Sequence, residues 1–200
     1  MKYNKEIAEI LSVLLSPVSA AFISVLIFTF FPINNALSSN LFFNLVLGIF
    51  FLCIFPVIAI LYYYKKGKVD IWVSERTIRT PFYVMAITGY VIAIIIFYYL
   101  KNLNLFVLSL SYALVTIAVM FGNVFRKISA HGAGIAGPIT AITFYFGLPA
   151  VPLYLLLPIT IWARLKLKAH SLFEVIMGIL IGSIITFGVY NLLYPHSYLL

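Results

Sequence analysis

Long apolar stretches separated by short polar segments dominate this sequence. A membrane-spanning helix needs about 20 mostly apolar residues. Stretches near that length cover residues 7–31, 41–64, 82–100, 104–125, 130–146, 149–163 and 170–192. Pro17 within the first favours a kink, and the fifth and sixth are short. The pattern predicts an all-α, polytopic bundle of transmembrane helices with six to seven spans.

Composition agrees with this interpretation. Of 200 residues, 64% are hydrophobic and 9% are charged, against about 25% charged in soluble proteins. A chain this apolar cannot cover its surface with polar groups in water, which excludes soluble enzymes, DNA-binding proteins and disordered chains. We expect one integral membrane domain over residues 1–200, multi-pass in the cell membrane. The single cysteine, Cys53, allows no intrachain disulfide.

The formal net charge is +8, and the basic residues are placed unevenly. An even number of predicted spans separates each polar segment from the next, so the segments should share one side of the membrane. These segments are the amino terminus, 65–81, 126–131 and 164–170. Every lysine and arginine except Lys101 falls in or beside them. The excess predicts a cytoplasmic face, and it allows several cations to converge on an anionic group among the phosphate-rich headgroups of membrane lipids. Topology alone accounts well for Lys2, Lys5 and the 65–68 cluster.

The segment before the third predicted span contains two arginines. Arg76 and Arg79 are three residues apart, so one helical turn would place both guanidinium groups on one side. Guanidinium groups bind phosphate oxygens and keep their charge when desolvated. The alternative is that both side chains simply reach the lipid headgroups.

The next segment combines a helix start with a histidine. Ser129 is a natural N-cap, and a helix amino terminus favours an anion. His131 can exchange a proton near neutral pH, and Gly132 allows a close approach to the backbone. The alternatives are a helix-capping histidine at the membrane interface and glycines that serve helix packing.

The last polar segment places His170 and Glu174 four residues apart, on one helical face. A carboxylate beside an imidazole fixes the tautomer and raises basicity, as catalysis by histidine requires. A structural His–Glu pair is the alternative.

Taken together, these segments supply charge neutralisation, a nucleophile and an acid, which are the needs of phosphoryl transfer. The chain has one aspartate, Asp70, so it lacks the aspartate clusters with which intramembrane prenyltransferases and CDP-alcohol phosphotransferases hold magnesium. We expect no metal and no cofactor.

The three segments resemble the three motifs of the type 2 phosphatidic acid phosphatase (PAP2) superfamily, relatives of the vanadium haloperoxidases. The family patterns are K-x6-RP, PSGH and SR-x5-H-x3-D. Arg164, His170 and Glu174 reproduce the third spacing, with Glu in place of Asp. Residues 128–131 approximate the second motif. In the first, one residue separates Arg79 from Pro81, and either Arg76 or Lys68 stands for the lysine. The resemblance implies a PAP2/haloperoxidase-like core over about 70–182.

The resemblance also implies roles. His170 would attack phosphorus and form a phosphohistidine, Glu174 would orient its ring, and His131 would protonate the leaving oxygen. The phosphate would be held by a larger set: Arg76, Arg79, Ser129, Ala130, Gly132, Arg164 and Lys68. The substrate would be a lipid phosphate monoester or a polyprenyl diphosphate, with no nucleic-acid partner. His196 is assigned no role.

A second hypothesis from another class remains open. The same basic pocket would also suit a non-catalytic binder or transporter of an anionic phospholipid or polyprenyl phosphate, with the chemistry lost.

Overall fold

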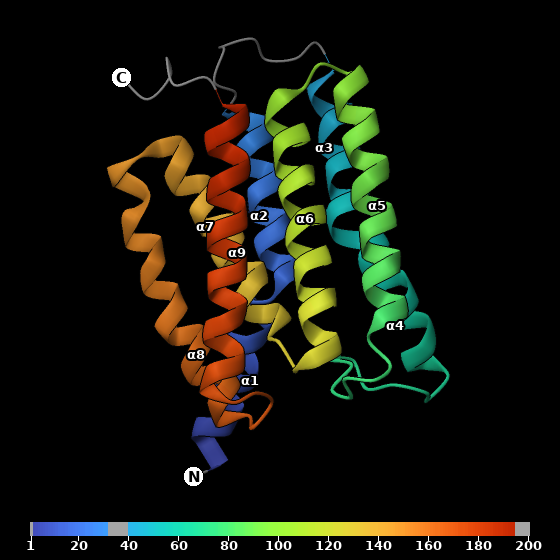
Figure 1. Cartoon of the computed structure of the whole chain (residues 1–200), viewed down its shortest axis with the longest axis vertical. Coiled ribbons are helices and arrows are strands. Elements are labelled where there is room, and N and C mark those ends of the chain that lie inside the picture. The colour runs from blue at the N-terminus through green and yellow to red at the C-terminus, as the bar shows by residue number, and fades with distance from the viewer. Residues whose placement is uncertain (1, 32–39, 195–200) are drawn as a thin grey trace.

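The computed structural model describes residues 2–31 and 40–194, and in this part of the chain every regular element is helical. The elements are α1 Lys2–Leu14, α2 Pro17–Phe30, α3 Leu41–Ile49, the π-helical η1 Phe50–Ile54, α4 Phe55–Lys65, α5 Thr80–Tyr99, α6 Leu103–Phe125, α7 Ala130–Phe146, the 3-10 helix η2 Leu148–Leu155, α8 Leu156–Lys166 and α9 Leu172–Leu193. The helices form a bundle with a common long axis (Figure 1). The predicted all-α class is confirmed.

Five helical segments are long and apolar enough to cross a membrane: Leu41–Lys65, Thr80–Tyr99, Leu103–Phe125, Leu148–Lys166 and Leu172–Leu193. The pair α1 and α2 makes a sixth if it crosses as one bent unit. Helix α7, predicted as a span at 130–146, has those bounds but only 17 residues. The chain is therefore a multi-pass membrane protein with five to six candidate spans, one fewer than the six to seven predicted, because α7 is too short and α1 and α2 form a bent pair.

The first predicted span is bent at the expected proline. Helices α1 and α2 meet at an angle of 41°. Ser16 caps α2 by accepting a hydrogen bond from the Ser19 N–H at 3.2 Å. Pro17 follows as the first helical residue, where its missing N–H does no harm. The bend brings the start of α2 against α7.

The second span is continuous but irregular. Pro56 cannot donate a backbone hydrogen bond, and just before it the Phe55 N–H reaches back five residues to the carbonyl of Phe50. This π-helical turn absorbs the proline within the segment Leu41–Lys65 without breaking it.

Glycines set the distance between α7 and α9, the two helices that begin at the second and third motifs. A Cβ atom on Gly132 would lie 2.7 Å from the Val175 carbonyl oxygen, and one on Gly182 would lie 2.5 Å from that of Ala133. Gly178 likewise abuts the Ser129 carbonyl. Because only glycine allows this approach, the amino-terminal ends of the two helices are held side by side.

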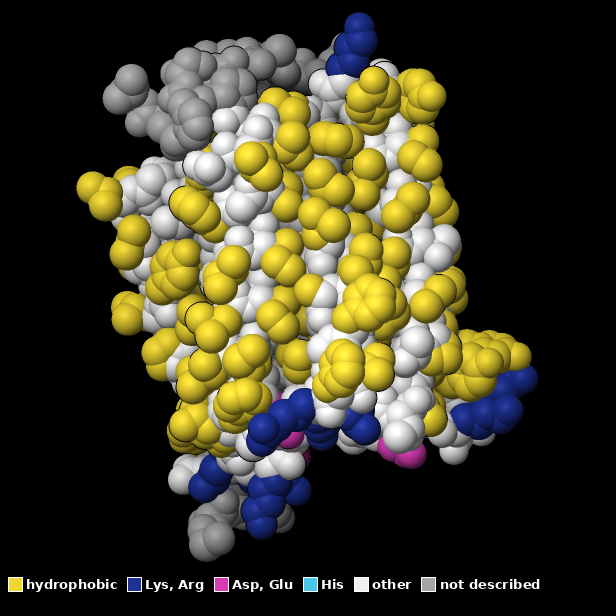
Figure 2. Space-filling model, in the orientation of Figure 1, with side chains coloured by type: hydrophobic (Ala, Val, Ile, Leu, Met, Phe, Trp, Pro, Cys, Tyr) yellow, Lys and Arg dark blue, Asp and Glu magenta, His cyan; other side chains and the backbone are white. Residues whose placement is uncertain are grey.

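The bundle has one strongly charged end. The amino end of α1, the α4–α5 connection, the α6–α7 loop and the α8–α9 connection all lie at the bottom of Figure 1, whereas the α5–α6 turn lies at the top. In Figure 2, Lys and Arg side chains gather along the bottom, and hydrophobic side chains cover the face between the two ends. The polar segments therefore lie at one end of the bundle, as their predicted sharing of one side of the membrane requires.

Candidate active site

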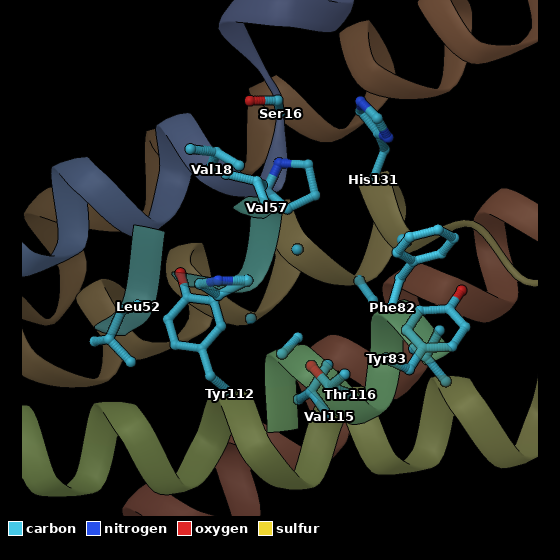
Figure 3. A pocket seen from close by; sticks show the side chains of 18 of the residues that line it. Ser16, Val18, Leu52, Val57, Phe82, Tyr83, Tyr112, Val115, Thr116 and His131 are labelled. Carbon is cyan, nitrogen blue, oxygen red and sulfur yellow. The ribbon is translucent and has the colours of Figure 1, made fainter. Parts of the chain in front are cut away.

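A cavity of about 460 Å³ opens between the helices and reaches the charged end. Its polar end is lined by Arg79, His131, Arg164 and His170, and its interior by apolar side chains of several helices. In Figure 3, His131, Phe82 and Tyr83 lie towards one side of the cavity, and Leu52 and Tyr112 towards the other. A polar end that continues into a long apolar space suits an amphiphile, with a charged headgroup and a hydrocarbon chain.

The four polar residues at this end come from α7, α8 and the connections α4–α5 and α8–α9, yet all are buried. Their exposed fractions are 6% for Arg79, 8% for His131, 4% for Arg164 and 9% for His170. Among the described residues, the close ion pairs are Lys5–Glu9 and His170–Glu174, so neither buried arginine is paired with a carboxylate. Burying an unpaired charge is expensive. An anion at this place would compensate the two guanidinium groups.

The predicted His–Glu pair forms. His170 Nδ1 lies 2.8 Å from Glu174 Oε2, and this contact fixes the imidazole with its other nitrogen available. Burial lowers the pKa of His170 to about 4, helped by the charges of Lys127, Arg164 and Arg79 and opposed by the hydrogen bond with Glu174. The ring is therefore neutral at pH 7, as a nucleophile must be.

Glu174 has a second role in the structure, at the start of α9. Its Oε2 accepts the Ser171 N–H at 3.2 Å, while the Ser171 hydroxyl accepts the Glu174 N–H at 3.4 Å. This reciprocal capping box begins α9. The same carboxylate thus starts the helix and orients His170.

The second motif forms as a capped helix start. The Ser129 hydroxyl accepts the Gly132 N–H at 3.2 Å, which confirms the N-cap. Ala130 and His131 follow and line the cavity, and His131 Nε2 is buried without a hydrogen-bond partner. Unlike Ala130 and His131, Gly132 does not line the cavity. Its N–H is already bound to Ser129, and its open side faces α9. Its role in the structure is helix packing, which was the alternative to phosphate binding.

Arg164 projects from the last turn of α8 into the polar end. Its Nη1 donates to the Ser12 hydroxyl at 2.6 Å, and its Nε is buried without a partner. The guanidinium carbon also lies 5.7 Å from the centre of the Trp72 ring. A donor on Arg164 therefore remains for a ligand.

Arg79 makes more hydrogen bonds to the protein itself than Arg164 does. Its Nε donates to the Val73 carbonyl at 2.7 Å, and its two Nη atoms donate to the carbonyls of Ile128 and Ser74, each at 3.4 Å. It thereby joins the α4–α5 connection to the α6–α7 loop. Its positive charge reaches the cavity, although these three nitrogens already have acceptors.

The structure separates Arg76 from Arg79. Residues 76–79 form a single hydrogen-bonded turn, in which the Arg79 N–H donates to the Arg76 carbonyl at 3.2 Å. This turn is not part of a helix, and α5 begins at Thr80. Arg76 instead donates to the Asn123 and Val124 carbonyls at the end of α6, at 3.3 and 3.0 Å. It satisfies a helix end and does not line the cavity.

Lys68 also lies away from the cavity. Its side chain is exposed, with Nζ 5.8 Å from the centre of the Tyr63 ring. Neither of the two residues considered for the lysine of the first motif is therefore at the polar end.

Three residues that sequence reasoning missed belong to this site. Ser12 binds Arg164, and Trp72 lies against both Arg164 and His131, with its ring centre 5.3 Å from that of His131. Lys127 donates to the Ala169 carbonyl, next to His170, at 2.8 Å. Burial and the charge of Arg79 lower the pKa of Lys127. Only Lys127, in the polar segment 126–131 directly before the second motif, carried a usable signal in the sequence.

Among the described residues, no three His, Cys, Asp or Glu side chains are grouped so that they could hold a metal ion. Comparison with protein-family models, with curated proteins and with solved structures finds no match for this chain.

Proposed function

We propose that this protein is a metal-independent membrane phosphatase that hydrolyses a lipid phosphate monoester or a polyprenyl diphosphate, in the manner of the PAP2 superfamily that its motifs resemble. The observation that carries the proposal is the polar end of the cavity. There, two buried arginines without carboxylate partners meet two buried histidines, one of which is hydrogen-bonded to a carboxylate. The apolar interior would receive the hydrocarbon chain.

In the first step, His170 Nε2 attacks phosphorus. A P–N bond forms as the bond from phosphorus to the lipid oxygen breaks, and a protonated His131 gives that oxygen its proton. Burial and the charge of Arg164 lower the pKa of His131 to about 3. The negative charge of the bound phosphate would raise this pKa, so that His131 carries the proton it gives. Glu174, 2.8 Å from His170 Nδ1, holds the ring and stabilises the positive charge it acquires. The lipid alcohol, or the lipid monophosphate from a diphosphate, then leaves.

In the second step, water attacks the phosphohistidine. Its oxygen bonds to phosphorus, the P–N bond breaks and inorganic phosphate is released, while His131 takes a proton from the water. Arg164 and Arg79 would stabilise the charge on the phosphoryl oxygens in both steps, with the amino terminus of α7 adding a partial positive charge. Each role belongs to a residue already in the site.

One observation favours the second hypothesis, a binder or transporter without catalysis. Arg79 donates from three nitrogens to protein carbonyls, and Arg76 and Lys68 lie elsewhere. The polar end thus offers fewer donors for a transition state than the family motifs imply. Such a pocket would still bind an anionic headgroup.

Phosphate release separates the two hypotheses. The purified protein in detergent is incubated with phosphatidic acid, phosphatidylglycerophosphate or polyprenyl diphosphate, each with and without EDTA. We expect release from at least one lipid that EDTA does not reduce, and a labelled phosphohistidine in quenched samples. Tight binding of these lipids without any release would support the binder instead.

We propose a cytoplasmic position for the site, because basic residues accumulate on the cytoplasmic side of membrane proteins. Cys53 is buried, so cysteines placed at Lys65 and Lys101 in a Cys53→Ser background report the two faces separately. An impermeant thiol reagent added to intact cells should label the Lys101 position and spare the Lys65 position. The reverse pattern would place the site on the outer face.

A further inference from the structure

The connection between α4 and α5 contains a short, strained turn that covers the polar end of the cavity. Val73 is buried and has a φ of 45°, a conformation rarely adopted by a β-branched residue. Strain of this kind persists only where surrounding contacts enforce it. The contacts around Val73 therefore show what holds the turn in place.

Asp70 and Arg79 enforce the turn from its two ends. The Asp70 carboxylate accepts the Trp72 N–H at 3.1 Å, the Ser74 N–H at 2.8 Å and the Ser74 hydroxyl at 2.8 Å. The Val73 carbonyl accepts from the buried Arg79 at 2.7 Å. The backbone on both sides of Trp72 is thus fixed.

This fixed backbone places Trp72 over the two groups whose nitrogens lack partners. Its ring centre lies 5.3 Å from that of His131 and 5.7 Å from the Arg164 guanidinium carbon. Trp72 lines the cavity and is also 39% exposed, so the indole separates the polar end from the surface. Its place explains how His131 and Arg164 are buried at the charged end of the bundle.

We propose that Trp72 selects the headgroup, admitting lipids that end in a phosphate and rejecting phosphodiester lipids. The inference rests on the proposed function, because it takes the phosphate to lie among His131, Arg164 and His170. A terminal phosphate carries one organic substituent, the lipid, which extends into the apolar interior. A phosphodiester carries a second one, which would need the space that the indole fills.

Binding tests this selectivity without relying on turnover. In a His170→Ala background, titration calorimetry in detergent compares dioctanoyl phosphatidic acid, a terminal phosphate, with dioctanoyl phosphatidylglycerol, a phosphodiester. With Trp72 present, we expect the phosphodiester to bind about tenfold more weakly or worse, because overfilling a packed site is unfavourable. In Trp72→Ala the ratio of the two dissociation constants, phosphodiester over terminal phosphate, should fall below about threefold. The fall should come mainly from tighter binding of the phosphodiester.

The chain supplies a matched control. Trp162 on α8 is the other tryptophan, is 41% exposed and does not line the cavity. Trp162→Ala should leave the ratio unchanged, and Trp72→Phe should give an intermediate ratio. Trp72→Leu is measured beside Trp72→Ala, so that the result does not depend on one variant folding.

The outcomes separate this inference from the proposed function. A ratio that stays the same in the Trp72 variants overturns the selection by Trp72, even if the wild-type protein releases phosphate. A ratio that collapses in them supports it, even if no phosphate is released. Failure of the Trp72-containing protein to bind either lipid overturns the selectivity together with the anion site itself.

Discussion

The two ends of the bundle differ in the charge that surrounds their buried polar groups. At the end away from the charges, the Asn104 amide donates to the Phe28 carbonyl, its oxygen accepts from the Tyr194 hydroxyl, and the Tyr145 hydroxyl donates to the Phe31 carbonyl. These groups satisfy one another and the end of α2. The nearby hydroxyls of Thr29 and Tyr190 are buried without a partner, but they are neutral. At the charged end, His131 Nε2 and Arg164 Nε have no partner.

The contrast teaches how to tell structural polar groups from functional ones in this protein. A buried polar group that is paired within the chain stabilises the fold. A buried polar group that has no partner and lies beside a cavity and an unpaired positive charge is better explained by a bound ligand. Changes at the charged end should therefore reduce activity more than stability, and changes at the other end should do the reverse.

The largest expected effect is at His170. His170→Ala removes the proposed nucleophile, so phosphate release should fall by at least about 10⁴-fold while the thermal unfolding midpoint stays close to that of the wild type. His196→Ala, which changes the histidine with no assigned role, is the control. Substantial activity in His170→Ala would rule out the phosphohistidine route.

Arg164→Gln should show the next largest effect. It removes a donor to the phosphoryl oxygens, so kcat/KM should fall by about 10²–10³-fold. Stability should be unchanged or higher, because the variant no longer buries an unpaired charge. Thermal unfolding and kinetics measured on the same preparation check both parts, and a lower midpoint with near-normal kinetics would show that Arg164 is structural.

At the other end, Tyr194→Phe should have the opposite profile. It leaves the Asn104 oxygen without the hydroxyl donor, so the free energy of unfolding should fall by about 1–2 kcal/mol. The kinetics at a temperature well below unfolding should match the wild type. Denaturant unfolding in mixed micelles measures the loss, and impaired turnover in the folded variant would contradict the division between the two ends.

The smallest effect concerns the pH dependence. The pKa of His170 is lowered to about 4 by burial, and the charge of Lys127 contributes to this. The neutral nucleophile thus persists as the pH falls towards 4 and is lost below it. Lys127→Gln should raise the pKa of His170, moving the acidic limb of kcat/KM to higher pH by less than about one unit. Movement to lower pH would show that Lys127 does not act on His170 through its charge.

The His170–Glu174 contact of the third motif was predictable because it is local. His170 and Glu174 are four residues apart at a helix start, a spacing that itself brings the side chains together. Ser129 was predictable as an N-cap for the same reason. The first motif was not, because Arg76 and Arg79 lie in an irregular connection, where spacing along the chain does not define a shared face.

By itself, the sequence determined the helical class, the approximate positions of most spans and the placement of the polar segments at one end of the bundle. These features depend on the lengths of the apolar stretches and on the even number of predicted spans between one polar segment and the next. Both can be read along the chain. Only the tertiary structure decided that Arg79 rather than Arg76 reaches the cavity, that Gly132 packs against α9, and that Ser12, Trp72 and Lys127 join the site. These contacts join residues far apart in the chain, and their geometry follows from how closely the helices pack.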